Sequence, residues 1–125
     1  MLIRYTANFV ANMESIEAFW DHYESPVRFD RLLAELTQTT LPNLSQHPKL
    51  GRYFFQRSPE SMDAKAKMAN LSAHFGLQTA NAQLREYVMT DYLLLYRVTD
   101  ETIDLLAIRH HKQLSFDIDT YLNVR

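Results

Sequence analysis

The sequence predicts an α+β domain in which an antiparallel β-sheet, made of an N-terminal strand and a C-terminal meander, packs against two or three N-terminal helices. Apolar residues recur at steps of three and four through the first two-thirds of the chain, which is the period of an amphipathic helix. In the last third they alternate, which is the period of a strand. No linker-like stretch separates the two parts, so we expect residues 1–125 to form a single domain.

Composition and charge exclude several classes of protein. Hydrophobic residues make up 46% of the chain, enough for one core, and there is no cysteine for disulfides or thiolate metal sites. No apolar run approaches the roughly 20 residues of a membrane span, and the N-terminus lacks a signal-peptide pattern, so we expect a cytoplasmic protein with no membrane partner. The net charge of −2 gives no overall attraction to nucleic acid, so phosphate binding would need a local cluster of cations.

Two helices are expected after a short strand at residues 2–5. The first has one apolar face, and core packing explains its aromatic residues, together with Tyr5, better than base stacking does. This face comprises Phe9, Met13, Ile16, Phe19, Trp20 and Tyr23. Ser25-Pro26 provides a cap and a first-turn proline for the second helix. Its apolar stripe comprises Phe29, Leu32, Leu33 and Leu36.

The segment between the second helix and the sheet is harder to assign. Two prolines and a glycine predict that residues 39–52 form a loop with at most one helical turn, pinned to the core by Leu41, Leu44 and Leu50. Ser58-Pro59 repeats the helix-start pattern, and methionine and alanine follow at helical spacing. A third helix over about 59–76 is therefore expected, either packed on the core or forming an arm outside it.

Three strands are expected in the last third of the chain, over residues 84–89, 92–98 and 102–110. Turn residues separate them at Thr90-Asp91 and Thr99-Asp100-Glu101, which predicts two hairpins of one meander. The middle strand is apolar on both faces, as expected for a strand at the centre of a sheet.

Four short motifs in this order resemble the RelE/ParE superfamily of bacterial toxins. They are Leu50-Gly51-Arg52, Leu84-Arg85-Glu86-Tyr87, the strand at 92–98, and Leu105-Leu106-Ala107-Ile108-Arg109-His110-His111. The resemblance implies a growth-inhibiting toxin of a type II toxin-antitoxin pair, of the plasmid stabilisation type, neutralised by a small antitoxin. The implied partners are the antitoxin and either DNA gyrase, for the ParE branch, or the ribosome and its mRNA, for RelE-like endonucleases. A homo-oligomer or a toxin-antitoxin hetero-oligomer would fit this reading.

Cations and histidines in the meander are the candidate site residues. Metal-independent RNA cleavage needs a base, an acid and cations that hold the phosphate. The candidates are Arg85, Arg97, Arg109, His110 and His111, which we expect to gather at one border of the sheet. Arginine binds phosphate through its planar fork, and histidine exchanges protons near neutral pH. No cofactor or metal is expected, because adjacent histidines in a strand point to opposite faces.

Departures from the RelE-like pattern favour the ParE branch. Leu93 stands where RelE-like enzymes usually carry a phosphate-binding arginine, and the lysines are scattered. The leading prediction is therefore that the sheet and its basic rim bind a target such as gyrase, while the antitoxin covers the same apolar groove. An mRNA endonuclease and a non-catalytic interaction protein remain as alternatives. For Arg85 and Arg97 a purely structural role, pairing with Glu86, Glu101 or Asp104 across the sheet, is favoured over a role in the site.

Overall fold

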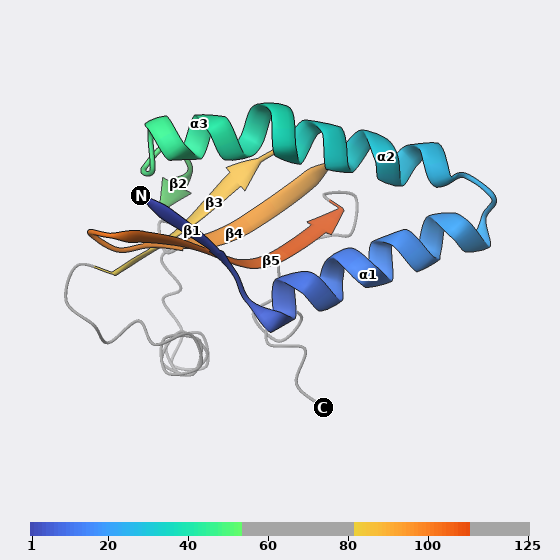
Figure 1. Cartoon of the computed structure of the whole chain (residues 1–125), viewed down its shortest axis with the longest axis horizontal. Coiled ribbons are helices and arrows are strands. Elements are labelled where there is room, and N and C mark those ends of the chain that lie inside the picture. Colours follow the sequence, from blue (N-terminus) through green and yellow to red (C-terminus); the bar gives the residue numbers. More distant parts are fainter. Residues whose placement is uncertain (54–81, 111–125) are drawn as a thin grey trace, which may run out of the picture.

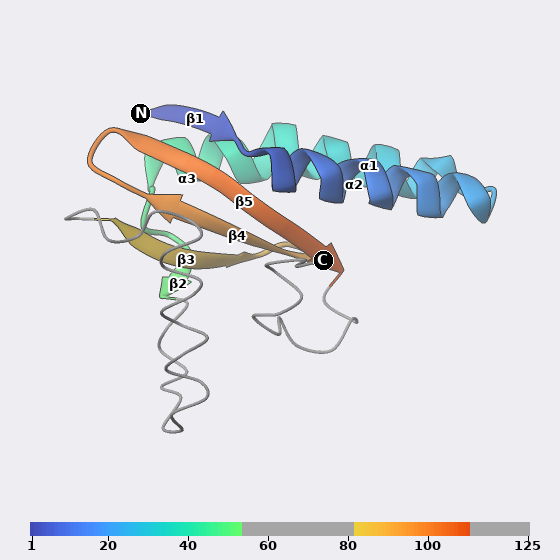
Figure 2. The same ribbon diagram turned by 90° about the horizontal axis from the view of Figure 1, so that it is seen from below.

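The computed structural model describes residues 1–53 and 82–110, and in this part of the chain a five-stranded sheet packs against helices on one face. Figure 1 shows the order of the elements, and Figure 2 shows the helices and the sheet as two layers. The predicted α+β class is confirmed. The helix expected over 59–76 lies outside the described residues, as does His111.

The meander forms as predicted, with boundaries close to those expected. It comprises β3 (Gln83–Val88), β4 (Tyr92–Val98) and β5 (Thr102–His110), paired antiparallel in sequence order. The strand order is β1-β5-β4-β3-β2, so β4 is central, as its two apolar faces predicted.

The two outer strands differ from expectation. Strand β1 (Leu2–Tyr5) pairs with β5 in parallel, so the sheet is mixed rather than wholly antiparallel. The N-terminal strand joins β5 through α1 and the rest of the fold rather than through a tight turn, and such a connection allows the parallel direction. At the other edge, β2 (Arg52–Tyr53) pairs antiparallel with β3, in a segment where the sequence predicted only loop.

Helix α1 (Ala7–His22) is anchored to an irregularity in the sheet. The register of β4 and β5 shifts between Leu95 and Tyr96, which leaves Leu106 as an extra residue in β5. The Leu106 carbonyl accepts a hydrogen bond of 2.8 Å from the Asn8 side chain. Thr6 caps the helix, because its hydroxyl oxygen accepts from the Phe9 amide at 3.2 Å. These polar contacts fix where α1 begins on the sheet.

The buried part of the apolar face of α1 is shorter than the apolar pattern in the sequence predicts. Phe9 is buried, and Met13, Ile16 and Trp20 pack against the core. Phe19 and Tyr23 are 51% and 61% exposed, so the expectation that they pack in the core is wrong. The reason is geometric, since the turn between α1 and α2 lies beyond the end of β5 in both views and the sheet does not extend beneath it (Figures 1 and 2). Tyr5, on the edge strand, is likewise exposed rather than buried.

The second helical segment is longer than predicted. It comprises α2 (Pro26–Glu35), a π-helical stretch η1 (Leu36–Thr40) and α3 (Leu41–Gln46), so residues 39–46 are helical and not loop. Pro42 lies in the first turn of α3, where a missing amide hydrogen is tolerated, rather than acting as a helix breaker. Leu44 is fully buried and Leu41 packs on the core, but Leu50 and Leu33 are exposed, against expectation.

Candidate functional site

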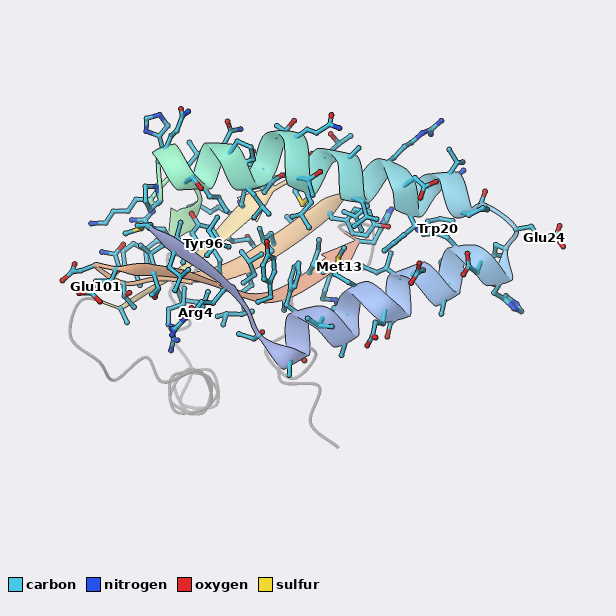
Figure 3. All side chains as sticks on the ribbon, viewed as in Figure 1. Arg4, Met13, Trp20, Glu24, Tyr96 and Glu101 are labelled. Carbon is cyan, nitrogen blue, oxygen red and sulfur yellow. The ribbon has the colours of Figure 1, made fainter. Side chains whose placement is uncertain are left out.

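The sheet has one face against the helices and one face turned away from them. Ile103, Leu105 and the other core residues of β4 and β5 lie on the helix face. Because side chains alternate along a strand, Asp104, Arg97 and their neighbours in register lie on the opposite face, which we call the open face. Arg4, paired in register with Asp104, belongs to it as well, and Figure 3 shows where Arg4 lies.

Three charged side chains from three adjacent strands meet on the open face. Arg4 Nε and Nη2 donate to the two carboxylate oxygens of Asp104, at 2.6 and 3.0 Å. From the other side, Arg97 Nε donates to Asp104 Oδ2 at 2.8 Å, and its Nη2 bonds to the same oxygen. The Asp104 side chain is 2% exposed, against 19% for Arg97 and 52% for Arg4. One buried carboxylate thus joins β1, β5 and β4.

Two arginines keep this buried carboxylate ionised. Burial alone would raise the pKa of Asp104, but the hydrogen bonds and charges of Arg4 and Arg97 together outweigh it and hold the pKa below its usual value of 3.8. The same hydrogen bond to Asp104 raises the pKa of Arg4. Two guanidinium groups thus hold one carboxylate, and Arg4 is the half-exposed member of the three.

Arg85 binds the backbone of residues 49–51 on the helix face of the sheet, and we call this segment the loop corner. Its Nη1 donates to the carbonyl oxygens of Gly51 at 2.6 Å and Lys49 at 3.1 Å, and its guanidinium lies 5.1 Å from the centre of the Tyr53 ring. The expected pairing with Glu86 does not occur, because Arg85 and Glu86 are adjacent in β3 and point to opposite faces of the sheet. The buried Glu86 accepts hydrogen bonds from Arg52 Nη2 and Nε at 2.5 and 2.8 Å. The favoured structural role of Arg97, pairing with Asp104, is confirmed.

Tyr96 completes the same corner from inside the core. Its hydroxyl accepts a hydrogen bond from the Gly51 amide at 2.8 Å and donates one to the Pro48 carbonyl at 2.9 Å. Burial raises the pKa of Tyr96, so the phenol stays protonated and able to donate. A side chain at Gly51 would meet the Tyr96 hydroxyl and the Glu86 carbonyl oxygen, each 2.7 Å from a Cβ placed there.

The remaining candidates lie at the other end of the strands. Arg109 pairs in register with Leu93 on the open face, four residues along β4 from Arg97, which corresponds to about 13 Å of strand. His110 lies on the helix face, with its ring centre 5.1 Å from that of Tyr92. Tyr92 in turn accepts a hydrogen bond of 3.1 Å from Trp20 Nε1.

The described candidate residues therefore do not gather at one border. Arg97 and Arg109 share the open face but lie at different ends of it, and Arg85 and His110 lie on the helix face. The sequence reasoning missed Arg4 as a member of the charged cluster. Its alternation with Ile3 and Tyr5 was visible, but nothing local indicated that β1 pairs with β5.

Within residues 1–53 and 82–110, no three or more histidine, cysteine or acidic residues are grouped so that they could hold a metal ion. No helix there is long and apolar enough to cross a membrane.

The chain matches one protein-family model over most of its length. Residues 3–115 match the family described as "ParE toxin of type II toxin-antitoxin system, parDE". The matched range begins within β1 and ends beyond β5. A comparison with curated protein sequences found no match.

Proposed function

Because the chain belongs to the ParE toxin family of type II toxin-antitoxin systems, we propose that it stops growth by binding DNA gyrase, without cleaving nucleic acid. Membership confirms the resemblance to the RelE/ParE superfamily and makes the chain a toxin with a cognate antitoxin as its partner. The gyrase target and the absence of a cleavage step are the proposed parts.

Binding is favoured over cleavage because Arg85 and Arg97 make structural contacts within the fold. A metal-independent endonuclease needs a base, an acid and a cation around one phosphate. Arg97 is instead committed to the buried Asp104, and Arg85 to backbone carbonyls at a corner of the sheet. Arg109 lies on the same face about 13 Å along the strands from Arg97, so the two are not neighbours in register.

The first experiment asks which target the toxin affects. The chain is expressed from a tightly controlled promoter, growth and message integrity are followed, and purified protein is added to gyrase on relaxed plasmid. We expect growth arrest with intact messages and loss of supercoiling. We also expect His110→Ala combined with His111→Ala to leave the arrest unchanged. Cut messages that disappear in this double variant would contradict the proposal and support the mRNA endonuclease.

The second experiment concerns the antitoxin. Co-expression of the small reading frame next to the toxin gene is expected to relieve growth arrest, because a cognate antitoxin covers the surface that the toxin uses. A chain that is harmless when expressed alone would contradict the toxic activity and leave a non-catalytic interaction protein.

A further inference from the structure

We draw no further inference here: the strongest candidate, the exposed aromatic side chains of Phe19 and Tyr23 at the end of the α1–α2 hairpin, lies beyond the end of the sheet, and nothing in the structure shows what covers it.

Discussion

Replacing Asp104 by asparagine should destabilise the protein strongly, because this carboxylate is buried between two guanidinium groups. The substitution keeps the size of the side chain but removes the charge that Arg4 and Arg97 both bind. Removing one partner of a buried ion pair costs about 3–5 kcal/mol. Since Arg4 is half-exposed and can turn towards water, we take the lower end, about 3 kcal/mol.

The expected loss can be measured in two ways. For a chain of 125 residues, about 3 kcal/mol corresponds to a fall in Tm of roughly 10 °C. Urea unfolding followed by the fluorescence of Trp20, the one tryptophan, gives the free energy of unfolding directly. Asp30→Asn, which alters an exposed carboxylate of α2, serves as the control and should change the stability by less than about 0.5 kcal/mol.

Replacing Arg97 and replacing Arg4 should reduce the stability by different amounts. Arg97→Ala should destabilise more than Arg4→Ala, because Arg97 is the less exposed of the two. A loss below about 1 kcal/mol for Asp104→Asn, in the range of surface pairs, would refute the reasoning. Equal losses for the two arginine variants would refute the ranking by burial.

Further predictions concern the same cluster, the loop corner and the helical turn. The pKa of Asp104 in the folded protein is below its usual value of 3.8, so its stabilising contribution is complete above the unfolded pKa and is lost as the pH falls through the folded pKa. Urea midpoints measured between pH 6 and pH 3 should therefore fall less steeply for Asp104→Asn than for the wild type. Tyr96→Phe should cost about 1–3 kcal/mol in urea unfolding, because the Gly51 amide and the Pro48 carbonyl lose their partner. Gly51→Ala should cost about 1–3 kcal/mol, and a neutral result would show that both the Tyr96 ring and the Glu86 carbonyl can move aside. Glu24→Gly should raise the unfolding free energy by up to about 1 kcal/mol, because Glu24 has a φ of 54° and glycine adopts positive φ without strain.

The sheet was predictable where the signal is local. Alternation over residues 84–110 and the Thr99-Asp100-Glu101 turn gave the three meander strands to within one residue, because adjacent antiparallel strands need only a tight turn. The parallel pairing of β1 with β5 has no comparable local signal. The two strands are about 100 residues apart, and a four-residue strand does not encode its neighbour.

The extent of the helices and the position of the candidate cations depend on tertiary structure. Periodicity identified the face of α1 that carries Phe19 and Tyr23, but not that the sheet ends before reaching them. Arg85 and Arg97 look equivalent in the sequence, yet the register sets Leu84 opposite Arg97, so Arg85 falls on the other face. The arginines therefore do not gather at one border of the sheet as expected. The register between strands is set by turns and core packing, which the residues around each arginine do not reveal.

The contact between Arg4 and Asp104 joins the edge strand β1 to β5, although the two residues are 100 positions apart in the chain. In a chain that ends before β5, β1 would have no strand to pair with. Arg97 would also lose its hydrogen bonds to the Asp104 carboxylate. The placement of β1 in the sheet thus depends on β5, and a fragment that stops at β4 should be unable to inhibit growth. For a toxin, we therefore expect no harm to the cell before β5 has been synthesised.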